Sequence, residues 1–414
     1  MFLRLWKKEC IQTGKSIVFL IFAACALLFF FSQMGQMDYL PEPTEGEESY
    51  AAYGSAVSTE PEDIMTSALS ALTNEYVSGS FSTYPVGFVK NVKLNKTEMA
   101  EVEAVLEKMT GLSVEELKEK TEQYYSERSL ITQAMEVKPA AGTDYEEFLK
   151  EMDQIDRLLG GGSEYSMKSL KKGVNVPMDY KAAQKSYENL IQKDRLTGGY
   201  ARLFCDYMGI VLGLIPVFVA VTRGVRDRRS QMSELIYTRK ASSAVVVLSR
   251  YAAMVTMMMA VVLVISCFPL AECVAYGNRN GIDVDYFAFV RYSFIWLLPE
   301  IMAVSAVGIF LTELTDSAAA VFVQAVWWFV SVFGSVSAMD GGDYGWGLVM
   351  RHNTEMNYAG YKSAAGQLLL NRAVYVSAAL VLAVLTIWVY SEKRKGRLLI
   401  REKILGNRKR KSAA

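Results

Sequence analysis

Six long apolar runs limit what this chain of 414 residues can fold into more than any other feature of its sequence. A helix needs about 20 consecutive apolar residues to cross the hydrocarbon core of a bilayer. Lipid offers no hydrogen-bond partner to the backbone, so such runs cross a membrane as helices. We therefore expect an α-helical integral membrane protein with six transmembrane helices, at residues 16–34, 203–222, 244–268, 292–311, 318–337 and 373–390.

The first run has two interpretations. It follows Arg4, Lys7, Lys8 and Lys15, and basic residues precede secretory signal peptides as well as membrane anchors. Its uncharged core is longer than that of a typical signal peptide, and no convincing small-x-small cleavage site follows it. We therefore interpret this run as a retained anchor. Cleavage would leave five spans in the same orientation.

Lysine and arginine predict the orientation of the spans, because loops rich in both residues stay in the cytoplasm. Basic residues predominate in residues 1–15, 223–240 and 391–414, whereas residues 36–199 carry 29 acidic and 17 basic side chains. An even number of spans separates the basic segments. We therefore expect a multi-pass protein of the plasma membrane with both termini in the cytoplasm. Residues 1–15 would form a cytoplasmic interfacial segment and residues 391–414 a basic cytoplasmic tail.

The acidic segment 36–199 is long enough to fold around a core of its own. Its start, residues 39–61, has the composition of a loose linker. Apolar residues alternate from Tyr84 to Leu94, which predicts a strand. Helices are expected after it, so the sequence predicts a mostly helical α+β extracytoplasmic domain inserted between the first two membrane helices.

Capping patterns mark the helices of this inserted domain. A Ser, Thr or Asn followed three residues later by Glu is typical of a helix start. We expect helices to begin at three such pairs, Asn95 with Glu98, Ser113 with Glu116 and Thr143 with Glu146. They would end near Gly111, Met135 and Gly160. A fourth helix, from about Asp179 to Leu196, would be hinged onto the second span by Gly198 and Gly199.

Few residues of this sequence form a pattern typical of a nucleotide, metal or catalytic site. Gly14, Lys15 and Ser16 match the end of a phosphate-binding loop, but Glu9 stands where that loop needs a glycine. His352 is the single histidine, and the five cysteines form no CxxC pair. We therefore expect no catalytic residue, no metal site and no cofactor bound by this chain. The sequence leaves a disulfide open and favours free thiols among the three cysteines expected near the outer face, Cys205, Cys267 and Cys273.

Net charge gives no reason to expect a nucleic-acid partner. The 44 basic residues are balanced by 44 acidic ones, and the basic residues gather at the predicted membrane edges. Four of them are interpreted as cytoplasmic basic anchors that follow the second span, namely Arg223, Arg226, Arg228 and Arg229.

A short amphipathic helix is predicted directly after these arginines, at residues 230–237. Its apolar side chains fall on one face, which by pattern alone favours a helix lying in the lipid headgroups over a helix docked on a cytoplasmic protein. The apolar residues of this helix are Met232, Leu235, Ile236 and Tyr237, and Glu234 is the acid among them.

Two acidic residues lie within the predicted spans. Glu300 follows Pro299 near the middle of the fourth span, and Asp206 lies near the outer end of the second. Ionisable groups inside a membrane are costly and often mark a path for substrate or ions. Both residues are therefore candidates for a translocation path. A neutral acid bonded to a neighbouring helix explains them equally, and an ion-coupled carrier built on Glu300 is a further hypothesis.

Several stretches carry a resemblance to a known family. These are Tyr200–Gly209 (YARLFCDYMG), Thr222–Arg250 with RDRRSQMSELIYTRKASS inside it, Phe310–Asp316 (FLTELTD), Asn371–Arg372, and the basic residues 392–396. Together with one helix, a large insert and five further helices, they resemble the permease subunits of type-2 ABC exporters of Gram-positive bacteria. The resemblance is architectural in the insert and more specific from Tyr200 onward.

The resemblance implies partners and a function. Such permeases pair with a separate cytoplasmic ABC ATPase, which binds ATP and Mg²⁺, and with a second permease copy or a paralogue in the lipid bilayer. Residues 230–237 would be the helix that couples to the ATPase. A membrane-anchored extracytoplasmic ligand sensor without transport is the alternative. The sequence identifies no substrate.

Overall fold

The computed structural model describes residues 1–35, 37, 39, 42–46, 53–84, 89–126, 135–334 and 344–397, except for the side chain of Ser233. The chain divides into two compact units. The bundle unit consists of Met1–Pro41 and Ser186–Ala414, and the insert unit consists of Glu42–Lys185. The insert unit is shorter than the predicted domain 36–199, because the segment after Lys185 packs with the bundle.

Most predicted spans appear as long apolar helices. Four helical stretches are long and apolar enough to cross a membrane, and a bent pair of helices makes a fifth when counted as one span. The four stretches are α2 (Ile17–Met34), α13 (Ser243–Asn280), the continuous stretch Ala288–Thr315, and α17 (Tyr358–Arg394). The stretch Ala288–Thr315 consists of α14 (Ala288–Tyr292), the π-helix η2 (Ser293–Leu297) and α15 (Leu298–Thr315).

The remaining predicted span, residues 318–337, contains α16 (Ala319–Gly334). This helix is apolar but has only 16 residues, so its length does not place it among the candidate spans. Residues 335–337 lie outside the described part of the chain. The sixth crossing therefore stays a prediction.

The second predicted span is broken. It consists of α10 (Thr197–Leu212) and α11 (Pro216–Arg229), which meet at an angle of 42°. Pro216 has no N–H to continue the helical hydrogen bonds, so carbonyl groups are freed at the break. Gln324 of α16 donates to the carbonyl of Gly213 at 2.7 Å, and the Trp328 indole donates to that of Ile210 at 2.7 Å. These bonds to α16 stabilise the bend.

Two of the long helices, α13 and α17, extend well beyond their apolar runs. α13 continues past Phe268 to Asn280, and α17 begins at Tyr358 rather than Ala373. The predicted spans 244–268 and 373–390 therefore cover only part of each helix. An apolar run marks where a helix meets lipid, whereas helix-forming polar residues carry the same helix onward.

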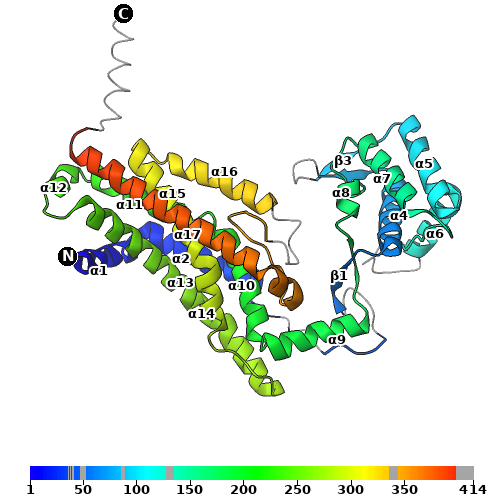
Figure 1. The fold of residues 1–414 in the computed structure, drawn as a ribbon, viewed down its shortest axis with the longest axis horizontal. Helices are drawn as coiled ribbons and strands as arrows, with labels where there is room; N and C mark the ends of the chain where they lie inside the picture. The colour runs from blue at the N-terminus through cyan, green and yellow to red at the C-terminus, as the bar shows by residue number, and fades with distance from the viewer. Residues whose placement is uncertain are drawn as a thin grey trace, which may run out of the picture. The chain divides into compact units, whose positions relative to one another are not determined.

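The bundle unit is built around α15. This helix packs against both α17 and α11, and Figure 1 shows the three helices side by side. The N-terminal helix α1 (Phe2–Gly14) packs along α13. Fully buried side chains from α10, η2 and α15, such as Phe204, Trp296 and Ile301, form part of the core.

The insert unit is mostly helical, as predicted. Two short antiparallel strand pairs accompany its helices: β1 (Ser55–Ser58) pairs with β4 (Val174–Pro177), and β2 (Phe81–Thr83) pairs with β3 (Lys90–Val92). The helices are α4 (Pro61–Ser78), α5 (Lys96–Thr110), α6 (Val114–Ser126), α7 (Tyr145–Leu158) and the single turn α8 (Met167–Leu170). Leu72, Leu106 and Phe148 meet in its core and are fully buried.

Two of the three predicted helix starts are confirmed. Asn95 caps α5 in a reciprocal capping box with Glu98, and Gly111 ends that helix in the left-handed conformation. Ser113 and Glu116 bond each other's backbone N–H groups at the start of α6. The third start lies one residue further along, because Asp144 rather than Thr143 accepts the N–H of its capping partner, Glu147.

Three further predictions for the insert differ from the structure. Tyr84–Leu94 is not one strand, since only Lys90–Val92 is extended there and residues 85–88 lie outside the described chain. The described helix α6 ends at Ser126, and Met135 is not helical. The hinge before the second span lies at Arg195 and Leu196, which have positive φ angles, and not at the following glycines.

The fourth predicted helix forms with a change of geometry. α9 (Tyr180–Glu188) passes into the π-helix η1 (Asn189–Lys193), and the chain then turns at Arg195 and Leu196 into α10. Gly198 and Gly199 are helical residues of α10. Gly199 is needed there for close packing, because a Cβ at this position would lie 2.5 Å from the carbonyl oxygen of Glu355.

Candidate functional site

The loop between α11 and α13 contains the predicted short helix, α12 (Ser233–Tyr237). Gln231 has a φ of 54°, which turns the chain, and the N–H of Met232 bonds the carbonyl of Asp227 at 2.9 Å. Met232 is 40% exposed and Leu235 is 59% exposed. Glu234 is exposed beside them, and Ile236 is half-buried. The loop therefore presents an apolar pair with one acid.

Tyr237 does not share the exposed face with Leu235. Its ring meets the ring of Tyr390 edge-on, with 5.5 Å between centroids. It also packs against the small apolar cluster that contains Ala241 and Val247. Tyr237 therefore fixes α12 to α13 and α17, while Met232 and Leu235 face away from the protein.

Arg394, the last residue of α17, holds the rest of this loop. Its guanidinium donates to three backbone carbonyl groups, those of Tyr237 at 2.8 Å, Arg239 at 2.6 Å and Ala241 at 2.6 Å. A planar guanidinium has five N–H donors in a fixed arrangement, so one side chain can bridge several acceptors. We call Met232–Ala241 with Arg394 the docking loop. Sequence analysis assigned Arg394 only to the basic tail, because backbone acceptors leave no sequence signal.

Three of the four arginines predicted as basic anchors bind other helices. Arg223 is buried and pairs with Glu9 of α1, and Arg226 bonds Gln12 of the same helix at 2.5 Å. Arg228 pairs with Asp316 at the end of α15. Arg229 is exposed. Anchoring at a lipid surface stays a prediction, and the structure adds that these arginines join α11 to α1 and α15.

Further ion pairs complete the contacts at this end of the bundle. Arg250 of α13 pairs with Asp227 of α11, and Lys393 of α17 bonds Asp316 of α15 at 2.5 Å. Charged side chains thus link the ends of α1, α11, α13, α15 and α17, all next to the docking loop. We call this end of the bundle the basic end.

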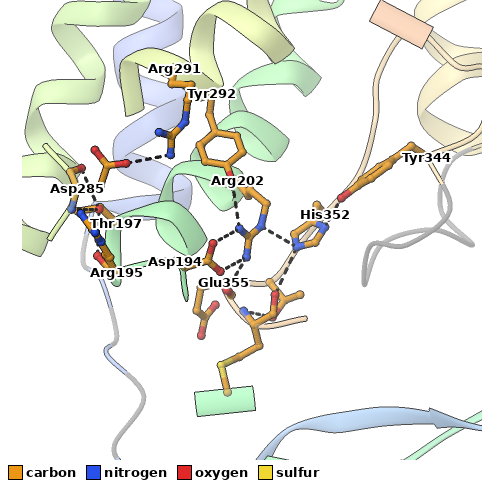
Figure 2. Close-up of polar contacts among 12 residues, drawn as sticks. Asp194, Arg195, Thr197, Arg202, Asp285, Arg291, Tyr292, Tyr344, His352 and Glu355 are labelled. Carbon is orange, nitrogen blue, oxygen red and sulfur yellow. Dashed lines mark hydrogen bonds and ion pairs between the residues drawn. The ribbon is translucent and has the colours of Figure 1, made fainter. Parts of the chain in front are cut away.

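The opposite end of the bundle holds a second buried network. Arg202 of α10 is fully buried and makes two hydrogen bonds of 2.6 Å to the carboxylate of Asp194. The Arg202 guanidinium also lies 4.7 Å from the centre of the Tyr361 ring. Figure 2 shows Asp194 and His352 directed at the Arg202 guanidinium from two sides. A bidentate carboxylate and aromatic faces are the surroundings that a buried arginine needs.

His352 belongs to the described segment between α16 and α17, which we call the 344–357 loop. Leu348, Val349, Met350 and His352 of this loop are fully buried. Nε of Arg202 donates to Nε2 of His352 at 3.4 Å, and Nδ1 lies 3.0 Å from the Tyr344 hydroxyl. Burial, helped by the Arg202 charge, lowers the pKa of His352 to about 3.

Asp206 also holds the 344–357 loop. It accepts hydrogen bonds of 2.8 Å from the Arg351 guanidinium and 2.8 Å from the backbone N–H of His352. Asp206 was predicted near the outer end of the second span, and its side chain is fully buried. A buried carboxylate with a charged partner and a backbone donor is well compensated.

Glu300 lies deeper in the bundle and has a different arginine. Nη1 of Arg372 lies 3.6 Å from its carboxylate, and the same atom donates to the carbonyl of Leu348 at 3.1 Å. Glu300 packs against the bend between α10 and α11, since a Cβ on Gly213 would lie 3.0 Å from Oε1. The structure therefore gives each candidate acid of the translocation path its own arginine partner. Arg351 belongs to the 344–357 loop, and Arg372 bonds a carbonyl of that loop.

Sequence analysis did not find Asp194, Arg202, Arg351 and Arg372 as partners. Arg202 lies directly before the second apolar run, and that position was the one available signal of a buried charge. The described residues contain no cluster of three His, Cys, Asp or Glu side chains able to hold a metal ion. All five cysteines, each in a described part of the chain, are free thiols.

The model of one protein family matches most of the chain. The family is described as ABC-2 family transporter protein, and the match covers residues 15–351. It therefore spans α2, the insert unit, the bent pair α10–α11, residues 232–241 of the docking loop, and the chain onward to Arg351. Neither the curated proteins nor the solved structures contain a match to the chain.

Proposed function

The chain belongs to the ABC-2 transporter family and is a membrane permease of an ABC transporter, and from this premise we propose that it is the permease subunit of an exporter driven by a separate cytoplasmic ATPase. The sequence has no complete phosphate-binding loop, so a partner must supply the energy of ATP hydrolysis. ATP and Mg²⁺ would bind to that partner. The family match supports the permease, and the docking loop supports the partner.

The docking loop is the observation that carries this proposal. Met232 and Leu235 expose apolar surface beside Glu234, while Arg394 and the Tyr237–Tyr390 contact hold the backbone behind them. A short helix that inserts apolar anchors into a groove is a common recognition mode. A loop whose backbone is already fixed loses less conformational entropy when it binds a partner. This surface therefore suits a groove on a cytoplasmic ATPase.

The proposed orientation follows from the basic residues. The basic end and the residues after Arg394 carry the positive charge expected on the cytoplasmic side. The insert unit would then lie outside the cell, where it would contact substrate before or after translocation. A second permease copy or a paralogue would complete the path. Glu300 and Asp206 would contribute to that path when their arginine pairs open.

The docking proposal predicts that Glu234→Lys combined with Leu235→Asp lowers retention of the ATPase. The full-length chain would be purified through an affinity tag from its native membranes, and the bound ATP-binding subunit identified by mass spectrometry. Replacing an apolar anchor and reversing the adjacent charge should reduce the retained ATPase at least about tenfold. The measurement is the ratio of the two subunits in the eluate.

Lys240→Asp is the matched control, because Lys240 is exposed in the same loop but lies outside α12. It should retain the ATPase at the unsubstituted level. Normal retention and normal nucleotide-driven transport in the double variant would refute the docking role of α12.

A further inference from the structure

The final helix, α17, is bonded to one loop at its C-terminal end and to another loop along its N-terminal half. It is one unbroken helix of 37 residues without a proline in its sequence. At a rise of 1.5 Å per residue it is about 55 Å long. One end lies at the docking loop and the other at the 344–357 loop. No other helix in the described part of the chain makes hydrogen bonds to both loops.

Arg394 makes the connection to the docking loop. Its three hydrogen bonds go to backbone carbonyl groups of Tyr237, Arg239 and Ala241, so they fix the path of the chain and not merely a side chain. Lys393 meanwhile bonds Asp316 of α15. A movement of α12 would therefore displace α17, because three hydrogen bonds join the docking loop to Arg394.

A single stripe of α17 makes the connection to the 344–357 loop. Gln367, Asn371 and Tyr375 are spaced by four residues, which places them on one face of the helix. The Gln367 side chain accepts the N–H of Tyr344 at 3.1 Å, and the Asn371 amide donates to the carbonyls of Gly345 at 3.2 Å and Gly347 at 3.1 Å. The Tyr375 hydroxyl donates to the carbonyl of Trp346 at 2.8 Å.

Other helices hold the same loop further along. The N–H of Val349 bonds Ser331 of α16 at 2.9 Å, and the N–H of His352 bonds Asp206 of α10 at 2.8 Å. The loop is therefore the place where α10, α16 and α17 meet. A shift of α17 relative to the other two helices must strain or break these bonds, because each is made to a different helix.

We propose that α17 mechanically couples the docking loop to the 344–357 loop, with Arg394 as the positioning residue at its C-terminal end and Asn371 with Arg372 as the positioning residues in its N-terminal half. The helix is stiff because its backbone is hydrogen-bonded throughout, whereas the bend between α10 and α11 interrupts the other route along the bundle. This inference rests on the proposed function, which makes the docking loop the ATPase contact. Engagement of the ATPase would change how firmly the 344–357 loop is held.

Hydrogen–deuterium exchange of the full-length chain in lipid nanodiscs, without any ATPase, tests this coupling. Arg394→Ala should raise exchange in peptides covering residues 233–241 and, by about fivefold, in peptides covering residues 344–352. Arg397→Ala is the matched control, because Arg397 is a nearby basic residue that pairs with Glu392 and makes no described contact with the docking loop. It should change neither region.

Linkage makes the coupling reciprocal, so the opposite variant gives a second test. Asn371→Ala should raise exchange in residues 233–241 as well as in residues 344–348. Leu370→Ala, at an exposed neighbouring position of α17, should leave both regions unchanged. Peptides from the middle of α13, at residues 255–262, report whether either variant has loosened the whole bundle.

A purely local effect would overturn the proposal. In that case Arg394→Ala would raise exchange at residues 233–241 and leave exchange at residues 344–352 unchanged. If Arg394→Ala also raises exchange at residues 255–262, the test is repeated with Arg394→Lys, which keeps the charge but cannot make the three hydrogen bonds to the docking loop. Exchange is then compared in the same two regions, residues 233–241 and 344–352. The experiment contains no ATPase, so its failure leaves the docking proposal standing. If the retention experiment failed instead, the two loops could still be coupled through α17, but the docking loop would not be the ATPase contact.

Discussion

At the scale of single residues, three buried acids of the bundle unit each lie beside an arginine. Arg202 meets Asp194, Asp206 meets Arg351, and Glu300 lies near Arg372. Removing one partner of such a pair leaves an uncompensated buried charge, which costs about 3–5 kcal/mol. The three pairs therefore specify how the helices and the 344–357 loop fit together more than they add to net stability.

His352 predicts a pH dependence of stability. Its pKa is about 3 in the folded protein, against an ordinary value of 6.5, because burial disfavours the charged imidazolium. Between these values the unfolded chain binds a proton that the folded chain does not, so stability is lost as the pH falls below 6.5. The loss is about 1.4 kcal/mol per pH unit, or about 2 kcal/mol at pH 5.

Thermal unfolding of the full chain at pH 7 and pH 5 would measure this contribution. His352→Asn has no titrating group, so its melting temperature should fall less over this interval than that of the unsubstituted chain. Equal falls in the two proteins would show that His352 does not become protonated on unfolding.

Individual residues also show where sequence reasoning reaches its limit. The capping box of Asn95 and Glu98 was predictable because both partners lie within four residues of each other. The Asp144 cap was missed because Thr143–Glu146 and Asp144–Glu147 have the same spacing. The contact of Arg202 with His352 spans 150 positions, and no local pattern relates such residues.

At the scale of elements, the capping box of α5 gives a direct test of the insert unit. Asn95→Ala removes the side-chain oxygen that accepts the N–H groups of Thr97 and Glu98. The loss should destabilise α5 by about 1 kcal/mol. Exchange of the amides of residues 96–110 in the full-length chain should therefore rise about fivefold.

Lys96→Ala is the control for this prediction, because Lys96 is exposed at the next position and caps nothing. Its effect should stay within about 0.5 kcal/mol. Similar exchange in the two variants would mean that Asn95 does not stabilise α5.

The existence of the membrane helices was predictable, but their ends and bends were not. Apolar runs identify stretches that avoid water, and such stretches must be helical in lipid. The extension of α17 to Tyr358 depends on Gln367, Asn371 and Tyr375 finding acceptors and donors in the 344–357 loop. The bend before Pro216 depends on Gln324 and Trp328 of α16.

At the scale of the whole molecule, the basic residues predict a definite topology. A membrane-impermeant maleimide applied to intact cells should label Lys120→Cys in the insert unit. It should label Ser230→Cys, beside the docking loop, only after the membrane is permeabilised. Both positions are exposed, so accessibility depends on the side of the membrane.

The unsubstituted chain measures the background from its five native cysteines. Labelling of Ser230→Cys in intact cells, or protection of Lys120→Cys, would reverse the topology. An ATPase in the cytoplasm could then not reach the docking loop.

The amino-acid sequence was sufficient for the membrane class, the helical character of the insert and the short helix after the arginines. These depend on composition and on patterns within a few residues, which hydrophobicity and helix geometry impose on any chain. Only the tertiary structure shows that the 344–357 loop is buried, which acid each arginine pairs with, and that Arg394 makes hydrogen bonds to the docking loop. Apart from Arg202 with Asp194, these contacts join groups tens to hundreds of residues apart, and only packing of the helices brings a buried charge to the partner that compensates it.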